Sequence, residues 1–280
     1  MLSARSITST RVLVLMPMSI ALNIVLGSVV GQVLRIPVYL DSIGTILVGV
    51  LAGPLPGLIT GVATDLVWGY AIPPPVGSPT AGPFAITAGC VGLLAGLWGR
   101  LGAFKRGRTM TVRPAGAAAG AVLMAGLVTI YTFSRAYATT KSFSATTGFE
   151  AGAFVASRTV FLLVALTFAG LVGYGLFLRR DPGMVLALAA GLVTGVAAAL
   201  ISAPIAAYVF GGVTGAGTDA LVAAFRAGGA TVYSAVLQQG LLSDPLDKMI
   251  TCAVVYLLIA EMPRRLLVRF SNGERLAGPG

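Results

Sequence analysis

The chain has 280 residues, of which 56% are hydrophobic and 10% are charged, and its mean hydropathy is +0.92. This balance excludes an ordinary soluble globular domain. The sequence contains no histidine, which excludes imidazole acid–base chemistry and a Ser-His-Asp site. The two cysteines, Cys90 and Cys252, both lie in apolar runs, so we expect small buried residues rather than a disulfide framework.

Apolar runs recur along the chain and predict an all-α integral membrane protein, a polytopic helical bundle of about six to eight membrane segments. The runs are Val12–Leu34, Ser42–Gly53, Leu55–Trp68, Phe84–Trp98, Ala115–Phe133, Thr159–Leu178, Met184–Phe210 and Met249–Ala260. No linker divides the sequence, so we expect a single transmembrane domain over residues 1–280. It would comprise N-terminal helices in 1–100, additional central helices in 101–182 and C-terminal helices in 183–280.

The net charge of +10 follows this predicted topology. If the N-terminus lies inside, most of the 19 Lys and Arg fall in inner segments, including the basic stretches at 100–113 and 264–275. This positive-inside pattern predicts cytoplasmic N- and C-termini and a multi-pass protein of the plasma membrane. The charge therefore indicates orientation and contact with membrane lipid, and not a nucleic-acid partner.

The most informative early feature is a helical hairpin over residues 39–70. Two apolar runs meet at the Gly-Pro-Leu-Pro-Gly sequence of residues 53–57, and Asp41 and Asp65 lie near their far ends. Each run makes roughly 20 Å of helix, which is shorter than a hydrocarbon core of about 30 Å. Short, Pro-broken membrane segments that carry charge usually line a cavity or pack inside protein. We therefore expect both carboxylates near one outer face, where Asp41 and Asp65 are candidate ligand-binding residues.

Asp65 is a candidate ligand-binding residue, because a carboxylate beside aromatic side chains suits a cationic or hydrogen-bonding ligand. Trp68 and Tyr70 supply those aromatic groups. The alternative is that the hydroxyl of Thr60 or Thr64, or water, satisfies Asp65 and gives it a purely structural role.

The loop that follows, Ala71–Pro83, holds five prolines in thirteen residues and cannot be helical. We expect a stiff, extended outer segment, which either caps a cavity or serves as a plain connector.

Residues 210–219 are rich in glycine and predict an unwound segment before an amphipathic piece at Asp219–Ala227. GAGTDA fits the G-x-G-x-x-A pattern, but a dinucleotide fingerprint needs a βαβ unit that a helical membrane chain lacks. Thr214, Thr218 and Asp219 are candidate binding residues, because this segment could form a second wall of the site that begins at the hairpin.

The stretch 238–248 precedes the last apolar run. Pro245 favours Asp244 as the N-cap of the last helix, a structural role. Gln239, Asp247 and Lys248 are additional candidate binding residues, because a charged pair at the start of a membrane helix is uncommon.

A faint internal repeat joins GLITGVATDL at 57–66 to GLVTGVAAAL at 191–200. It indicates either an ancient duplication or two helices that share a glycine-rich packing face, and we favour the second interpretation.

Several segments together resemble the substrate-binding (S) component of energy-coupling factor vitamin transporters. The segments are ALNIVLG, YLDSIGTILVGVLAGPLPGLITGVATDLVWGY, FAITAGCVGLLAGLWG, FGGVTGAGTDALVAAF and DPLDKMITCAVVYLLIAEMPRRLL. They cover roughly the first hundred and the last seventy residues. Two features depart from that family, which usually has six helices in a shorter chain and a small-residue Ala-x-x-x-Ala motif on its first helix. Here Gly27 and Gly31 stand in a G-x-x-x-G pattern instead.

The resemblance implies a membrane subunit that captures a vitamin-like micronutrient from outside and delivers it inward. A transmembrane coupling protein and two cytoplasmic ATPases would be its partners, which agrees with the absence of a G-x-x-x-x-G-K-[ST] phosphate loop. Gly27 and Gly31 would be the docking positions for the coupling protein. We expect no enzyme activity, catalytic residue, metal or cofactor. The alternative is a multi-helix membrane sensor without transport; an attached output domain is not recognisable in the sequence.

Overall fold

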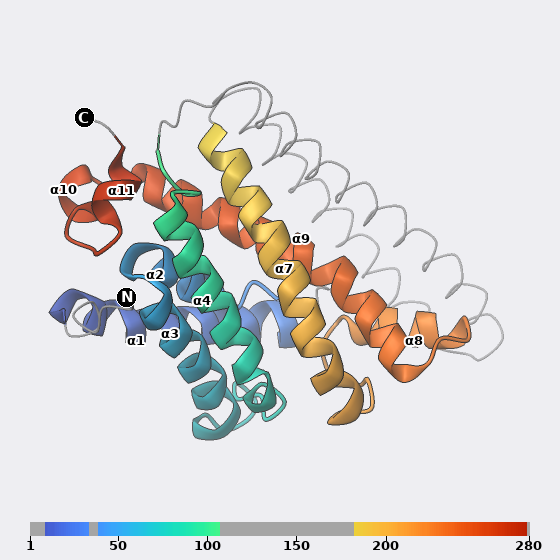
Figure 1. Ribbon diagram of the computed structural model, residues 1–280. Helices are drawn as coiled ribbons and strands as arrows, with labels where there is room; N and C mark the ends of the chain where they lie inside the picture. Colours follow the sequence, from blue (N-terminus) through green and yellow to red (C-terminus); the bar gives the residue numbers. More distant parts are fainter. Residues whose placement is uncertain (1–8, 34–38, 107–181, 279–280) are drawn as a thin grey trace.

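The computed structural model describes residues 9–33, 39–106 and 182–278, and within these ranges every regular element is a helix (Figure 1). The elements are α1 (Thr10–Gly27), the π-helix η2 (Ser28–Val33), α2 (Ile43–Ala52), α3 (Pro54–Leu66), the π-helix η3 (Val67–Ala71), the short η4 (Gly82–Phe84), α4 (Ala85–Leu101), α7 (Pro182–Tyr208), α8 (Asp219–Ala227), α9 (Val232–Glu261), α10 (Arg264–Leu267) and α11 (Gly273–Ala277). The predicted runs at 115–133 and 159–178 lie outside the described residues.

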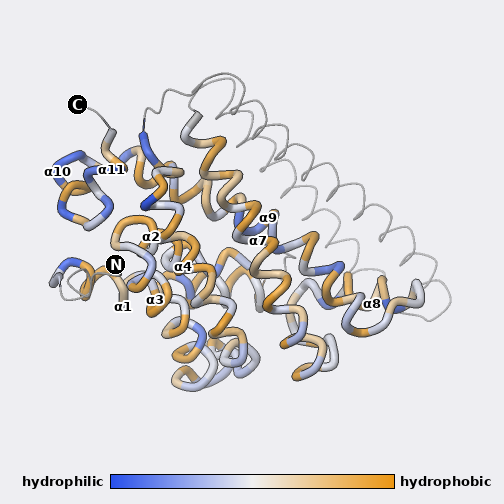
Figure 2. The backbone as a smooth tube through the Cα atoms, in the orientation of Figure 1, coloured by the Kyte–Doolittle hydropathy of each residue, from blue (hydrophilic) through white to orange (hydrophobic). Residues whose placement is uncertain are grey.

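Three of the described helices are long and apolar enough to cross a membrane: Thr10–Gly31, Gly82–Leu101 and Gly183–Tyr208. α9 is longer still, with 30 residues, but polar side chains interrupt its apolar sequence (Figure 2). α2 and α3 have 10 and 13 residues, so both arms of the predicted hairpin are short.

The hairpin turns at Gly53, which separates α2 from α3. Its φ of +109° and ψ of 177° belong to a region that only glycine adopts readily, and Pro54 then begins α3. On the other side of this elbow, α3 packs against α4 through glycine. A Cβ added at Gly57 would collide with the carbonyl oxygen of Gly92. The two backbones therefore approach closely, as small-residue helix contacts allow.

α7 packs against α9 in a comparable way (Figure 1). A Cβ at Gly191 would collide with the backbone of Lys248 and Met249, and one at Gly195 would collide with that of Pro245. Gly57 of α3 and Gly191 of α7 begin the two matching decapeptides, and each lies at a close helix contact. The packing interpretation of the repeat therefore accounts for both segments.

The N-terminal half of α9 corrects a sequence prediction. Asp244 was expected to cap a helix that begins after it, but α9 begins at Val232, and the N-cap is Thr231, whose side chain accepts a hydrogen bond from Ser234 N–H. Pro245 lies inside this helix. The pattern misled because proline is common at a first helical turn, and here neighbouring helices hold the chain helical through it.

The loop after η3 also differs in part from its prediction. The predicted non-helical stretch was Ala71–Pro83, but Ala71 ends η3 and Pro83 lies in η4. Residues 72–81 between them are not helical, and they form successive turns and not a fully extended segment. The glycine-rich stretch 209–218 is irregular, and α8 has the predicted bounds.

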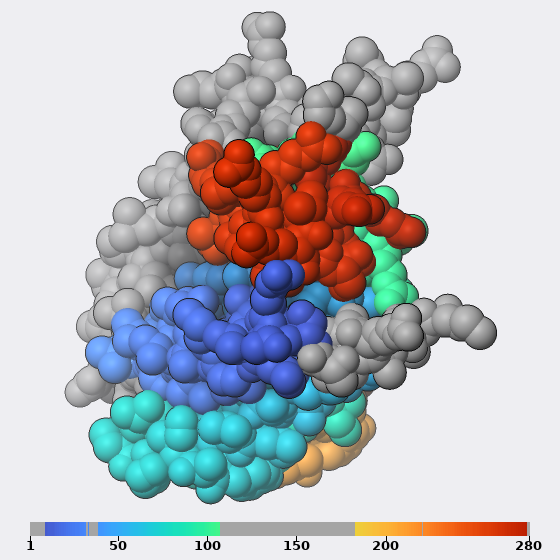
Figure 3. All heavy atoms as spheres, turned by 90° about the vertical axis from the view of Figure 1, so that its left-hand side faces the viewer, coloured from blue at the N-terminus to red at the C-terminus, as the bar shows by residue number. Residues whose placement is uncertain are grey.

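The C-terminal segment packs across the elbow end of the bundle. Asn272 donates from its backbone N–H to Leu51 O and from Nδ2 to Val50 O, and Ser271 Oγ donates to Ala52 O. These donors satisfy carbonyl groups that the end of α2 leaves without helical partners. Figure 3 shows this C-terminal segment, in red, lying over the first helix, in blue.

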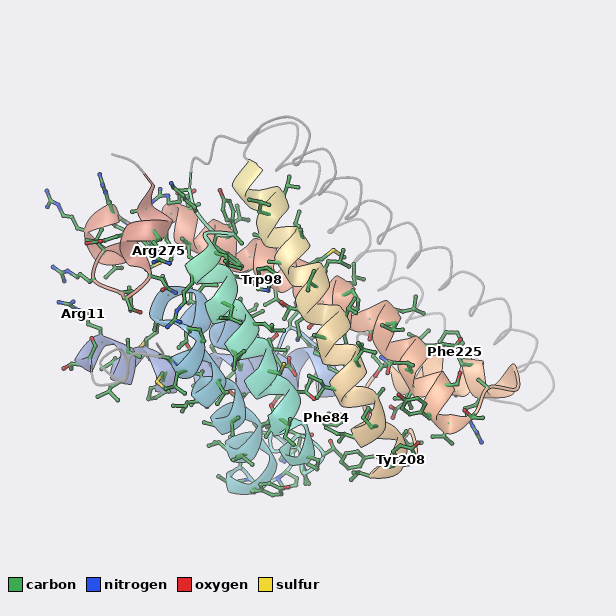
Figure 4. The ribbon with its side chains drawn as sticks, in the orientation of Figure 1. Arg11, Phe84, Trp98, Tyr208, Phe225 and Arg275 are labelled. Atoms are coloured by element: carbon green, nitrogen blue, oxygen red, sulfur yellow. The ribbon has the colours of Figure 1, made fainter. Side chains whose placement is uncertain are left out.

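Arginine side chains join the helix ends in the same region (Figure 4). Arg275 Nη1 donates to Arg100 O at 3.0 Å, and Arg106 Nη1 donates to Met262 O at 2.8 Å. Arg11 Nη1 reaches Arg269 O at 3.4 Å. The beginning of α1, the end of α4 and the segment after α9 therefore share one basic end of the molecule.

Candidate functional site

A cavity of about 190 Å³ lies between the N-terminal helices and the C-terminal helices. Its polar wall residues come from the linker before α2, from α2 to α4 with the loop between η3 and η4, from α7, from the segment around α8 and from α9: Tyr39, Asp41, Ser42, Thr45, Thr64, Asp65, Ser78, Thr80, Thr87, Ser202, Thr214, Asp219, Gln239, Asp244 and Lys248. Apolar and aromatic wall residues include Trp68, Phe84, Val91 and Val236.

A buried polar contact between α1, α2 and α3 positions the N-terminal wall. Asn23 of α1 is fully buried and donates from Nδ2 to Thr45 Oγ1 at 2.8 Å and to Thr64 Oγ1 at 3.2 Å. Its Oδ1 accepts the N–H of Gly44 at 2.7 Å. Because all three bonds are buried, they fix how the hairpin sits on α1.

Asp65 is 8% exposed and lines the cavity, and no hydrogen bond or ion pair within the described residues satisfies its carboxylate. The neighbouring hydroxyls are already engaged. Thr60 donates to Pro56 O and Thr64 donates to Thr60 O, each at 2.8 Å. The structural alternative for Asp65, in which Thr60 or Thr64 satisfies it, is therefore not what the structure shows.

Trp68 lies one turn beyond Asp65 and also lines the cavity. Its indole N–H donates to Val76 O at 2.8 Å, and Ser28 Oγ donates to the same carbonyl at 3.1 Å. The ring is held against α1, since a Cβ added at Gly27 would lie 2.6 Å from Trp68 Cη2. Two bonds to Val76 O thus tie the proline-rich loop to the cavity wall.

Lys248 is the one Lys or Arg side chain that the described residues place at the cavity wall. Its Nζ lies 2.6 Å from Asp247 Oδ2, 2.7 Å from Ser42 Oγ and 3.8 Å from Asp41 Oδ1. The Asp41 side chain is 26% exposed. Burial raises the pKa of the Asp41 carboxyl above its ordinary value, and the Lys248 ammonium opposes that rise.

Asp247 does not line the cavity and is fully buried behind it. Its Oδ1 accepts the backbone N–H groups of Tyr39 at 3.2 Å and Leu40 at 2.8 Å. Leu40 has a φ of +51°, an uncommon conformation for a non-glycine residue. Asp247 therefore positions the linker before α2 rather than meeting a ligand directly.

Asp219 closes the irregular segment before α8. Its carboxylate accepts the backbone N–H and the hydroxyl of Thr214, at 3.0 and 2.9 Å, and the N–H of Gly215 at 2.7 Å. Thr218 is buried outside the cavity wall, where its hydroxyl lies 2.9 Å from the Tyr39 hydroxyl. Burial raises the pKa of Tyr39, so this phenol stays neutral.

A hydrogen-bonded row on α9 forms the remaining wall. Gln239 Nε2 donates to Ser243 Oγ at 2.6 Å, and Ser243 Oγ donates to Asp244 Oδ1 at 3.1 Å. Ser202 of α7 approaches Asp244 Oδ2 at 3.5 Å. Sequence reasoning assigned Asp244 a capping role and so missed it as a wall residue. Continuing the helix through Pro245 would have placed it one turn from Lys248.

Three candidates occupy other places than expected. Tyr70 is 69% exposed and packs on Gly82, outside the cavity wall. Gly27 and Gly31, the expected docking positions, both line the cavity, and Gly27 faces Trp68 and Asp41.

The remaining candidates divide into two groups. Asp41, Asp65, Trp68, Thr214, Asp219, Gln239 and Lys248 line the cavity, whereas Thr218 and Asp247 support it from behind.

Among the described residues, no group of three or more His, Cys, Asp or Glu side chains is placed to hold a metal ion. No protein-family model, curated protein or solved structure matches this chain. The function must therefore be inferred from the cavity itself.

Proposed function

We propose that this chain is the substrate-capture subunit of an energy-coupling factor type ABC transporter in the plasma membrane. It would bind a vitamin-like small molecule from outside and deliver it inward. A transmembrane coupling protein and two cytoplasmic ATPases would supply the energy. The observation that carries the proposal is the cavity, which has a buried carboxylate, Asp65, with no partner among the described residues.

Three features support this proposal. The cavity joins segments from both ends of the sequence, as a binding site between helices of a bundle does. Its wall mixes a few polar groups with aromatic and aliphatic ones, the composition expected for a small-molecule site. The sequence segments that resemble the S components also supply most of the polar wall residues.

Reconstitution with coupling and ATPase subunits tests the proposal. The chain would be co-expressed with a coupling module, purified as a complex and placed in liposomes. Uptake of a bound small molecule should then require both ATP and this chain. A stable complex with such subunits and ATP-dependent uptake would support capture for transport. Ligand binding without any such complex, together with recovery of a signalling partner, would favour the membrane-sensor alternative.

A further inference from the structure

The charges around the cavity do not balance. Five carboxylates and one ammonium lie at the wall or directly behind it within the described residues: Asp41, Asp65, Asp219, Asp244, Asp247 and Lys248. Buried carboxylates are costly unless they are paired, hydrogen-bonded or protonated. The partners of each one therefore indicate which of them is open to a ligand.

Two of the carboxylates are already occupied. Asp247 accepts Lys248 and two backbone N–H groups, and Asp219 accepts three donors from residues 214 and 215. Asp244 receives only hydroxyl donors, from Ser243 and Ser202. Asp65 receives no bond that the structure shows. Among the described carboxylates of the cavity, Asp65 is therefore the one most open to a cationic ligand.

Lys248 does not provide a site for an anionic ligand. An ammonium has three donors, and Asp247, Ser42 and Asp41 surround Nζ within 3.8 Å. An anion would have to displace Asp247 or Asp41 from it. The described wall contains no other Lys or Arg.

The wall beside Asp65 suits an organic group as well as a charge. Trp68 is one turn away, with its indole N–H donated to Val76, so its ring supplies an aromatic surface. Phe84 also lines the cavity and stacks on Phe210, with ring centroids 5.7 Å apart. The Thr87 hydroxyl is buried at the cavity wall and has no hydrogen-bond partner among the residues that the structure describes. Aromatic faces attract cations as well as apolar groups.

The cavity volume indicates the size of the part of a ligand that the cavity holds. The cavity measures about 190 Å³, and a cavity on the order of 150 Å³ holds a molecule such as benzene. A compact organic molecule with one ring or a short aliphatic body fits these dimensions.

We propose that the cavity takes a small organic cation, an ammonium or amidinium compound, whose charged nitrogen is held by the carboxylate of Asp65 beside Trp68. This inference rests on the proposed function, since it names the substrate class of the same cavity. A second bond from the cation goes to Asp41 or Asp244, the other wall carboxylates that lack a full set of donors.

A set of probes with one shape and three charges tests the proposal. Benzamidinium, benzamide and benzoate carry charges of about +1, 0 and −1 at neutral pH on nearly the same planar frame. Binding to the purified full chain in detergent would be measured by calorimetry. Benzamidinium should bind at least about ten-fold more tightly than benzamide, because a charge-assisted bidentate bond to a buried carboxylate is strong. Benzoate should bind least.

Two variants test whether the preference for benzamidinium over benzamide depends on Asp65. Asp65→Asn keeps the shape of the side chain and should remove most of the benzamidinium preference. Glu274→Gln removes an exposed carboxylate on α11, at the basic end, and should leave the preference unchanged. If Asp65→Asn does not fold, the comparison of the three probes on the unaltered chain still decides the question.

The remaining outcomes overturn the proposal. Equal binding of benzamidinium and benzamide would mean that Asp65 is protonated and serves a neutral ligand. Tighter binding of benzoate would mean that the site selects anions, and no detectable benzamidinium binding would mean that the carboxylate is not accessible. A neutral or anionic compound taken up in the liposome assay would overturn the charge assignment and leave the capture function standing.

Discussion

The ammonium nitrogen of Lys248 lies 2.6 Å from Oδ2 of Asp247, the residue beside it in α9. Adjacent residues on a helix point in different directions, and here their side chains contact different parts of the linker before α2. Lys248 turns to the cavity and to Ser42, whereas Asp247 turns to the backbone of Tyr39 and Leu40. One pair of opposite charges thus holds the linker before α2 from two sides.

Asp247→Asn should therefore destabilise the protein strongly. The change leaves the buried Lys248 without its nearest counter-charge, and breaking a buried ion pair on one side costs about 3–5 kcal/mol. The free energy of unfolding in detergent micelles would be measured for this variant and for Asp247→Asn combined with Lys248→Met. The double variant should recover part of the loss, because it removes the uncompensated charge.

Arg265→Gln is the matched control, since Arg265 is exposed on α10 and its change should alter stability by less than about 1 kcal/mol. If Asp247→Asn lowered the free energy of unfolding no more than this control, the Asp247–Lys248 ion pair would contribute little to holding the linker.

Asn23→Ala should loosen the attachment of α1 to the hairpin. Its loss leaves the Gly44 N–H and the Thr45 hydroxyl without the partner that Asn23 supplies in a buried region, whereas the Thr64 hydroxyl still donates to Thr60 O. Two such groups at about 1–3 kcal/mol each give an expected loss of roughly 2–6 kcal/mol. The decrease in unfolding temperature in detergent would be compared with that of Gln238→Ala, which removes an exposed hydrogen bond to Ser234. Similar decreases for the two variants would contradict the assignment.

Gly27→Ala should lower stability, whereas Gly31→Ala should not. A methyl group at Gly27 would lie 2.6 Å from the Trp68 ring, whereas one at Gly31 meets nothing within 4 Å. We expect Gly27→Ala to cost about 1–3 kcal/mol through overpacking. Gly31→Ala should be neutral or stabilising by up to about 1 kcal/mol, because alanine favours helix. Unfolding temperatures of the two variants test this directly, and a greater loss for Gly31→Ala would overturn the packing account.

Asp219→Ala should release the irregular segment before α8. Three donors from Thr214 and Gly215 lose their acceptor, while the helices α7 and α9 keep their own contacts. Amide hydrogen exchange should speed up over residues 211–217 by about ten-fold or more and stay unchanged in the middle of α9. Thr231→Ala, which removes a cap at the start of α9, is the control, and its effect should stay near residue 234. Unchanged exchange at 211–217 in Asp219→Ala would show that the carboxylate does not hold this segment.

Much of the N-terminal architecture follows from local sequence signals. Gly53 has a φ that favours glycine and Pro54 suits a first helical turn, so a break between two short helices was predictable at this point. The start of α8 at Asp219 was predictable as well, since glycines precede an amphipathic stretch. Charge in or beside an apolar run is uncommon, and that rule singles out three of the residues that line the cavity: Asp41, Asp65 and Lys248.

The remaining features depend on partners that are distant in sequence. Asn23 is one polar residue in an apolar run, and only the fold brings Thr45 and Thr64 to it. At Pro245 the sequence predicted a helix start that the structure does not have. The local signal was overridden because this part of α9 packs against α7 and stays helical. Tyr70 is close in sequence to Asp65, but its side chain is exposed and lies outside the cavity wall.

The order of synthesis gives the contact between Lys248 and the linker a further meaning. Lys248 follows Ser42 by 206 residues, so the ribosome completes the first hairpin long before it reaches the lysine. During that interval Asp41 has none of the counter-charge that Lys248 later supplies. We therefore expect this carboxyl to stay protonated or in contact with water until α9 is in place, because only then does the ammonium of Lys248 lie beside it.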